Sequence, residues 1–535
     1  MRSLLARNID RVAGLSPWRW PALRLHQLAL TSLLLWTAIE CFGPVSTKSM
    51  AWSTYDRMQQ QRLWTSAPDP RLLIIDIDER SLADLAPEFG RWPWPRDTLA
   101  SVLQYAEAQG ARAIVFDILF SDPDRLHPGG DRALEAAVRA STASFFTGVR
   151  LPLALDAKSE LLAGQLPGLV QPGPAGGTGT PVALILPFMQ AMIDSARLGT
   201  NTVQVDNDGK IRRFADTERL ADGAVLRSIP AAVASHLGVT VGDATAPRLV
   251  AWRDRPDAYP RWSFSRIWQC AEGRPGIDCP ALAGRILLVG ATAASLHDIK
   301  TTPLAAQHMG VDILATLIDN ALHGRSVNEL PPLWRWVLCV AALALAWLTV
   351  RHGRAGSSAH ALWALPTLLM ALAYASLHSE VIYLDLTLPA TAALSFLSAV
   401  KLHDLLRRVR FGQPDDACYG PWAVACGGSA AQAEDIERAV FDVAAVSASL
   451  VSGGAASSGD NGSCHASWTM WALPDARAAN EIEQALHKAA PQAWRVAFAV
   501  GRTPQHDLHQ AMACALSVQR DEQPRTTPEI PYVHS

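Results

Sequence analysis

Four acidic side chains end or follow two short apolar runs of the chain: Asp76, Asp78, Glu79 and Asp117. In open α/β sheets, ligands bind beyond the carboxyl ends of the strands. Acids at such an edge could hold a cation or an amine ligand. We therefore take Asp76, Asp78 and Asp117 as candidate ligand-binding residues. The alternative is that these side chains cap helices and loops, as aspartate commonly does.

A stiff aromatic segment, Arg-Trp-Pro-Trp-Pro-Arg, occupies residues 91–96. Its two prolines restrict the backbone, and its arginines could bind an anion in a pocket lined by indole rings. Arg91, Trp92 and Arg96 are therefore further candidates for ligand binding. We favour the alternative, in which the segment locks a loop across a sheet and its tryptophans join the core.

Residues 206–209 (Asp-Asn-Asp-Gly) are similar to part of a calcium-binding loop. An EF-hand would need an acid where Gln204 stands and a glutamate where Ala215 stands, and neither is present. The Asp-Gly pair instead favours a hairpin turn between two short strands.

The elements that carry these residues follow an α/β pattern. Apolar runs at 71–77 and 111–120 predict buried strands, and residues 97–110 between them have helical spacing. Strand, helix and strand in this order predict a βαβ unit with a parallel pair. A further strand is expected at 285–289 and a helix at 308–323.

Two loops are also expected in this region. Residues 164–180 are rich in glycine and proline, which predicts a flexible surface insertion. His297 and Asp298 follow a strand and a turn that contains glycine. They could contact a ligand, although a local polar network is the simpler interpretation.

Four apolar stretches are long enough to cross a hydrocarbon core, which takes about 20 residues. They cover residues 25–45, 333–350, 359–377 and 381–400. Basic residues cluster before the first stretch, after the second and after the fourth, so the positive-inside rule places both termini in the cytoplasm. A cleaved signal peptide is the alternative for the first stretch, but its apolar part would be shorter, at about 7–15 residues.

This topology divides the chain into parts with different surroundings. Residues 1–24 form a basic cytoplasmic N-terminus, residues 46–331 an extracytoplasmic domain, and residues 411–520 a cytoplasmic module followed by a disordered tail at 521–535. We expect a multi-pass protein of a bacterial inner (plasma) membrane, embedded in the lipid bilayer. Asp385 near the end of the last stretch is expected to be hydrated.

Two of the eight cysteines, Cys270 and Cys279, fall in the outer domain. That side of the membrane is oxidising, and the glycine and proline between them let the chain bend back, so we predict a disulfide. The other cysteines are expected to be reduced thiols rather than zinc ligands, because no C-x₂-C pair is present. We expect no metal and no cofactor.

Five stretches carry a resemblance to a known family: Asp69–Arg96, Gly110–Asp124, Asn201–Phe214, Leu287–Leu304 and Gly310–Leu322. In their order and spacing they resemble the CHASE extracellular sensory domain of the second type, over most of residues 50–330. The resemblance implies an α/β sensor domain with one transmembrane helix before it and three after it. It also implies a receptor that works as a homodimer.

The inner module alternates strand-like and helix-like runs, which is typical of a small α+β domain. We predict strands over 422–426, 467–473 and 494–501, a helix over 430–450 and a loop over 452–463.

Proteins with this type of outer domain usually carry a class III nucleotide cyclase or a protein kinase inside the cell. The kinase loops are absent from residues 401–535. A cyclase needs paired carboxylates for two metal ions, and Asp442 has no convincing second. We therefore expect a divergent or non-catalytic output module with no catalytic residue.

The composition limits the remaining choices. The chain of 535 residues has a net charge of −3 and 18% charged residues, which gives no support for nucleic-acid binding. Our leading hypothesis is a transmembrane sensor for an extracytoplasmic small molecule or envelope signal, relayed by contact to a cytoplasmic protein partner. The alternatives are a membrane-bound adenylate cyclase with a divergent catalytic domain and a structural envelope protein that binds another protein.

Overall fold

The computed structural model describes residues 22–43, 48–172, 179–241, 246–296, 298–352 and 357–411, together with four strands between residues 422 and 499. The chain forms two compact units. The first, here called the α/β unit, comprises residues 47–330 and 372–385. The second comprises residues 1–46, 331–371 and 386–535.

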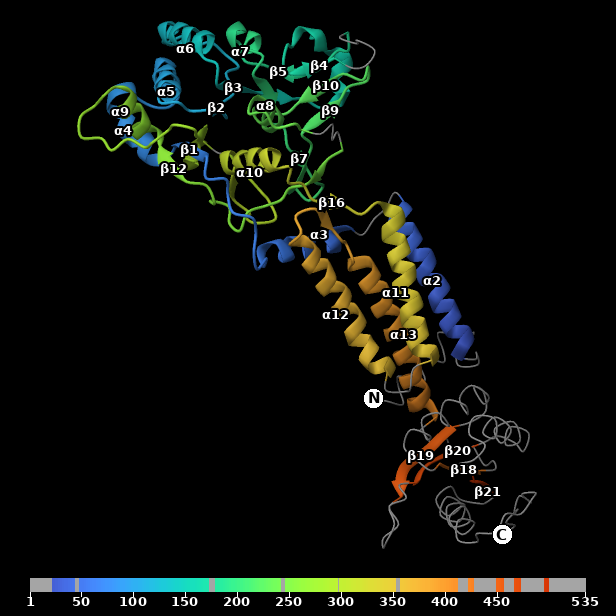
Figure 1. The fold of residues 1–535 in the computed structure, drawn as a ribbon. Coiled ribbons are helices and arrows are strands. Elements are labelled where there is room, and N and C mark those ends of the chain that lie inside the picture. Colours follow the sequence, from blue (N-terminus) through green and yellow to red (C-terminus); the bar gives the residue numbers. More distant parts are fainter. Residues whose placement is uncertain are drawn as a thin grey trace. The chain divides into compact units, whose positions relative to one another are not determined.

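A seven-stranded sheet forms the centre of the α/β unit (Figure 1). Its order is β12-β1-β13-β2-β3-β5, with β6 also paired to β3, and every pairing is parallel except β3 with β5. The strands are β1 (Leu72–Ile77), β2 (Ala113–Phe116), β3 (Ser144–Arg150), β5 (Leu184–Ile185), β6 (Leu198–Thr200), β12 (Arg261–Ser263) and β13 (Ile286–Ala291).

Helices cover both faces of this sheet (Figure 1). One face carries α4 (Glu79–Phe89), α5 (Asp97–Ala108), α6 (Pro128–Ala140), α7 (Gln190–Asp194) and α9 (Phe264–Ala271). The other carries α8 (Ile229–His236) and α10 (Gly310–His323). Strand β1 shows why both layers form, because Leu73 and Ile75 pack on the first and Leu72 and Ile74 on the second.

The predicted βαβ unit is present, but its two strands are not neighbours. Strand β13 lies between β1 and β2 and pairs in parallel with both. Its apolar residues from Ile286 to Val289 are fully buried, which suits a central strand. The strand expected over 111–120 is also shorter, ending at Phe116, because the residues after it leave the sheet as a loop.

Smaller sheets and turns surround the main sheet. They contain β4 (Val170–Gln171), β7 (Gln204–Val205), β8 (Ile211–Phe214), β9 (Thr217–Arg219), β10 (Val225–Arg227), β11 (Arg248–Leu249), β14 (Ile299–Lys300) and β15 (His308–Met309). Strands β7 and β8 form the hairpin that the Asp-Gly pair predicts, with Gly209 at φ +81°.

The expectation of a flexible insertion over 164–180 is wrong for its first part. Leu166 and Leu169 are buried in the core on the α5 face, and β4 pairs with β10. These apolar side chains fold the segment onto the domain despite its glycine and proline content. Residues 173–178 lie outside the described residues.

The α/β unit also contains α3 (Lys48–Gln60) and a segment from much later in the chain. Strand β17 (Ile382–Tyr383) pairs in parallel with β16 (Asn328–Glu329). The last apolar stretch therefore does not begin its helix at residue 381, as the hydropathy predicts, because α13 (Thr387–Phe411) starts only after this strand. Asp385 precedes that helix.

The described part of the second unit contains four long helices: α2 (Ala22–Phe42), α11 (Pro332–His352), α12 (Ser357–Leu377, up to residue 371 in this unit) and α13. Apolar residues of all four meet in one cluster. In the described part of the chain, two helical stretches are long and apolar enough to cross a membrane, Pro332–Arg351 and His360–Leu377. Four transmembrane stretches were expected, and these two have the length and composition of a helix that crosses a membrane.

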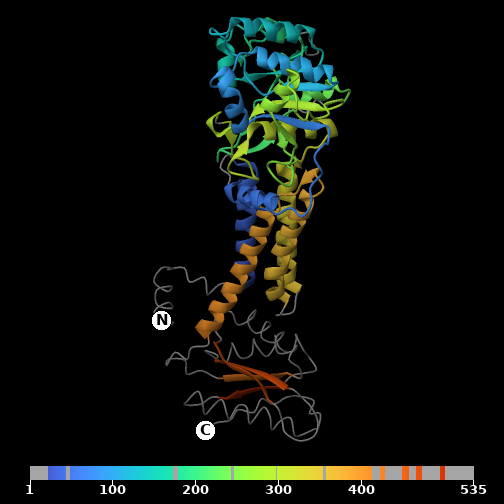
Figure 2. The same cartoon turned by 90° about the vertical axis from the view of Figure 1, so that its left-hand side faces the viewer.

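A four-stranded antiparallel sheet lies in the C-terminal part of the second unit (Figure 2). Its order is β19 (Ser449–Ala456), β20 (Ala466–Ala472), β18 (Trp422–Gly427) and β21 (Arg495–Ala499). The three predicted strands are present. Strand β19 was not predicted, and it occupies the end of the expected helix and the start of the expected loop. Asp442 lies outside the described residues.

Candidate functional site

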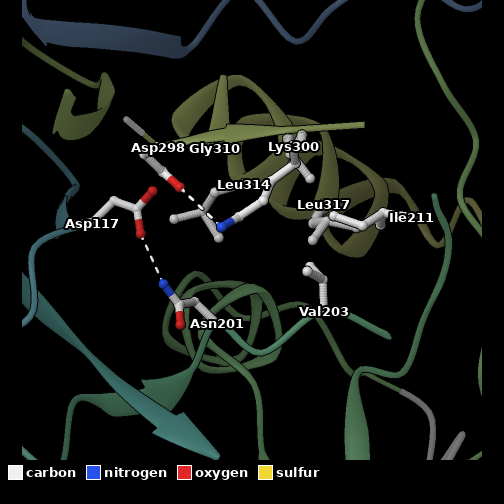
Figure 3. A pocket seen from close by; sticks show the side chains of 10 residues that line it. Asp117, Asn201, Val203, Ile211, Asp298, Lys300, Gly310, Leu314 and Leu317 are labelled. Atoms are coloured by element: carbon white, nitrogen blue, oxygen red, sulfur yellow. Dashed lines mark hydrogen bonds and ion pairs between the residues drawn. The ribbon is translucent and has the colours of Figure 1, made fainter. Parts of the chain in front are cut away.

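A pocket opens where β2 ends and α10 begins (Figure 3). It encloses about 370 Å³, part of which is open to solvent. Its polar lining consists of Asp117, Asn201, Asp298 and Lys300, and its apolar lining consists of Val203, Ile211, Ile313, Leu314 and Leu317. Gly310 completes the wall. The pocket thus combines a charged end with a hydrocarbon end.

Two glycines allow the elements around the pocket to approach closely. Gly290 of β13 is paired with Asp76 of β1, and a Cβ atom there would lie 2.7 Å from the Val311 side chain of α10. A Cβ atom on Gly310 would collide with the carboxylate of Asp298. The start of α10 can therefore lie directly against the sheet and against Asp298, which closes the pocket on that side.

Asp117 is an acid of the pocket whose pKa is raised. Asn201 Nδ2 donates a hydrogen bond of 2.9 Å to Asp117 Oδ1. Burial, and next the negative charge of Asp298, raise the pKa of Asp117 to about 6, while the bond from Asn201 and the charge of Lys300 oppose this shift. Lys300 itself is paired with Asp298, at 3.5 Å between Nζ and Oδ1. The site therefore has two acids and one ammonium group.

Asp76 lies at the same edge and on the same face of the sheet as Asp117. Its carboxylate is already paired with other groups of the fold. It accepts a hydrogen bond of 2.6 Å from the Thr292 hydroxyl and is paired with Arg261 at 3.3 Å. Arg261 also pairs with Asp312 of α10 at 2.9 Å. Burial raises the pKa of Asp76 above its usual value and that of Asp312 to about 6. This network joins the sheet to α10.

Asp78 caps a helix, which was the alternative interpretation of the acids. Its Oδ1 accepts hydrogen bonds from the backbone N–H and the hydroxyl of Ser81, at 2.7 and 2.6 Å, in the first turn of α4. Its other oxygen accepts from Ser263 at 2.5 Å. Both oxygens are therefore used within the fold.

The Arg-Trp-Pro-Trp-Pro-Arg segment lies on the opposite face of the sheet, in the layer of α5. Trp94 is 2% exposed and stacks on Phe264, and Trp92 packs edge-on against it. Arg96 pairs with Asp131 of α6 at 2.5 Å, whereas Arg91 is exposed. These contacts give the segment a structural role, and none of its candidate residues lines the pocket.

Of the six candidate ligand-binding residues, Asp117 is the one that lines the pocket. Sequence reasoning missed Asn201, Lys300 and the apolar wall. One feature of the sequence could have identified them, because these residues lie in three of the stretches that carry the family resemblance. Asp298 was noted beside His297, which lies outside the described residues.

Acidic side chains in other clusters form ion pairs with arginines. Asp206 and Asp208 of the hairpin turn pair with the buried Arg212, at 2.9 and 2.6 Å, so the turn is not arranged as a calcium loop. The ligand atoms of Asp69, Asp319 and His323 lie close enough together to hold a metal ion. Arg71 and Arg253 pair with two of these acids, which makes the group an ion-pair cluster.

The structure joins Cys270 of α9 to Cys279 in the predicted disulfide. It closes the loop that follows α9, and neither cysteine lines the pocket.

The family model of the CHASE2 domain matches residues 28–350. No curated protein and no solved structure matches the chain.

Proposed function

The chain belongs to the CHASE2 domain family of extracellular sensor domains, and we propose that it is a membrane-anchored receptor for a small organic cation. In this proposal, residues 46–331 lie outside the cytoplasm, helices α2, α11, α12 and α13 cross the membrane, and residues 411–520 act in the cytoplasm. The module would pass the signal to a protein partner by contact, and the receptor would work as a homodimer.

The observation that carries the ligand class is the pocket beside Asp117. The pocket is small and partly open to solvent, so it suits a ligand with only a few non-hydrogen atoms. Two carboxylates face one ammonium group, so the ionised pocket carries a net negative charge that favours a cation. Figure 3 shows the carboxyl groups of Asp117 and Asp298 at one end and Leu317, Ile211 and Val203 at the other.

An organic amine fits this lining better than a metal ion. Calcium takes about 6–8 oxygen ligands, whereas the wall formed by Ile313, Leu314 and Leu317 offers none. Lys300 would repel a divalent ion about twice as strongly as a singly charged ammonium group at the same distance. A primary ammonium group can donate to both carboxylates while its hydrocarbon part contacts the leucines. An amine with a short apolar chain therefore matches both ends of the pocket.

Thermal unfolding of the full chain in detergent tests this ligand class. We expect n-butylamine to raise Tm in a saturable way, because a ligand that binds the folded state stabilises it. Neither n-butanol, which has the same butyl chain, nor butyrate, whose alkyl chain is one carbon shorter, should do so. Asp117→Asn should weaken the apparent Kd for n-butylamine about 30-fold or more. Replacing Asp122, an exposed acid five residues further along the chain, by asparagine should leave the Kd unchanged.

Three outcomes would contradict the assignment. A stronger effect of butyrate would reverse the inferred charge of the site. Equal effects of all three compounds would show an apolar pocket without charge recognition. Binding of the amine that survives Asp117→Asn would place the site elsewhere.

The membrane topology has its own test. Fusions that end at residues 331 and 379 should be active with a phosphatase that works only outside the cytoplasm. Fusions that end at residues 354 and 410 should be fluorescent with a protein that folds only inside. Any exchange of these two patterns would refute the proposed order of four spans.

A further inference from the structure

The loop between α12 and α13 is an integral part of the α/β unit. Residues 372–385 belong to this unit, although the family match ends at residue 350. Within the loop, Ile382 and Tyr383 form a two-stranded sheet with β16. The Tyr383 ring is buried and lies 5.0 Å from the ring of Tyr55 in α3.

Glu380 fastens this loop to the segment that enters the sheet. Its Oε1 accepts from Arg62 Nη2 at 2.9 Å and from the backbone N–H of Ser66 at 3.1 Å. Its Oε2 accepts from the Ser66 hydroxyl at 2.5 Å. Glu380 is 9% exposed and the Arg62 side chain 3%. The carboxylate is therefore a buried charge that accepts hydrogen bonds from residues 62–66.

The backbone at Glu380 is also unusual. Its φ angle is +52°, in the left-handed region that residues other than glycine seldom occupy. Such a conformation persists when surrounding contacts hold it. Burial would raise the pKa of Glu380, but the hydrogen bonds from Ser66 and the charge of Arg62 lower it below its usual value. The carboxylate is thus charged at neutral pH.

The same loop contacts the segment that connects α10 to α11. Asn328 donates its backbone N–H to the carbonyl of Val381 at 2.9 Å, and its side chain donates to the same oxygen at 3.1 Å. Arg325 approaches Glu380 Oε2 at 4.0 Å. Residues 325–329 lead directly into α11.

The end of α12 adds two contacts to the entering segment. The Tyr374 hydroxyl donates to the carbonyl of Gln61 at 2.6 Å. The ring of His378 lies 4.2 Å from that of Trp64. Three chain segments therefore meet here, residues 61–66, 325–329 and 374–385, and we call this meeting point the junction.

We propose that the junction is the element through which the α/β unit controls α12 and α13. The ion pair between Glu380 and Arg62 lies at its centre. The entering segment, the segment before α11 and the loop that joins α12 to α13 are held by one set of bonds. A displacement of the sheet relative to α10 would therefore move these connections together. Because α13 continues toward the C-terminal module, the junction is where such a displacement would enter that helix.

Native-state hydrogen exchange of the full chain in lipid nanodiscs tests this proposal. Glu380→Gln keeps the size of the side chain and removes its charge, so Arg62 stays buried without its carboxylate partner. We expect exchange about 100-fold faster or more in residues 378–385, since loss of one partner of a buried pair is strongly destabilising. We also expect faster exchange in residues 61–66 and 325–329, and a changed rate in residues 401–411 of α13. Strands β1 and β13 should be unaffected.

The control is Glu272→Gln, an exposed glutamate of the same unit, which should change none of these rates. If Glu380→Gln prevents folding, Ser66→Ala removes one hydrogen bond and should give the same pattern with a smaller amplitude.

A change confined to residues 378–385 would overturn the proposal, since Glu380 would then fix only its own turn. An unchanged exchange rate in residues 401–411 would also overturn it, because the junction would then stabilise the α/β unit without affecting α13. The experiment uses no ligand, so its result is independent of whether n-butylamine binds beside Asp117.

Discussion

Replacing Asp117 by asparagine should stabilise the protein at neutral pH, although it removes the proposed ligand partner. The pKa of Asp117 is raised from 3.8 to about 6 in the folded chain, first by burial and then by Asp298. A shift of one pKa unit corresponds to about 1.4 kcal/mol. The ionised carboxyl thus disfavours the folded state by up to about 3 kcal/mol above pH 7. Because the Asp117 side chain is partly exposed, solvent screening reduces this destabilisation to about 2 kcal/mol.

The sign of the pH dependence follows from proton binding. Between about pH 4 and pH 6 the folded chain holds a proton on Asp117 that the unfolded chain has released, so the wild type loses stability as the pH rises through this range. Asparagine is neutral throughout and keeps a carbonyl oxygen to accept from Asn201. Its advantage should be full above pH 7 and absent below about pH 4.

Thermal unfolding of the full chain in detergent at pH 7.5 and pH 4 measures this difference. A gain of about 2 kcal/mol corresponds to a rise in Tm of about 4–8 °C at pH 7.5. Asp312, whose pKa is also raised to about 6, is present in both proteins, so the difference isolates Asp117. A lower Tm for the variant at pH 7.5, or an equal difference at both pH values, would refute the reasoning.

Three further predictions concern the packing around the site and the stability of the α/β unit. Gly310→Ala should destabilise the unit by about 1–3 kcal/mol and weaken n-butylamine binding, because the new methyl group would collide with Asp298; unchanged Tm and affinity would contradict the geometry of the pocket wall. Trp94→Ala should cost about 3–5 kcal/mol, since the indole is 2% exposed, and a loss in Tm no larger than that of an exposed residue would argue against its place in the core. Replacing both Cys270 and Cys279 by serine should cost about 3 kcal/mol through the closed loop between them, and a reducing agent should lower Tm in the wild type but not in the variant.

Local sequence patterns determined most of the elements. Runs of apolar residues such as 71–77 predict strands buried on both faces, and the spacing in 97–110 predicts the helix that follows. The hairpin at residues 206–209 depends on an Asp-Gly pair. Such patterns concern residues that are near in sequence, so they can be read without knowing the fold. The order of the characteristic stretches likewise indicated the family that residues 28–350 match.

The site depended on contacts that no local pattern contains. Strand β13 inserts between β1 and β2 because its run from Ile286 is apolar on both faces, yet that run could fit several places in a parallel sheet. Once it is placed, Asp76 is neutralised by Arg261, whereas Asp117 faces a pocket built from distant parts of the chain. Glu380 shows the same limit. The hydropathy pattern places it in a short connection between the apolar stretches 359–377 and 381–400. Only the fold brings its carboxylate to Arg62 and Ser66, more than 300 residues earlier in the chain.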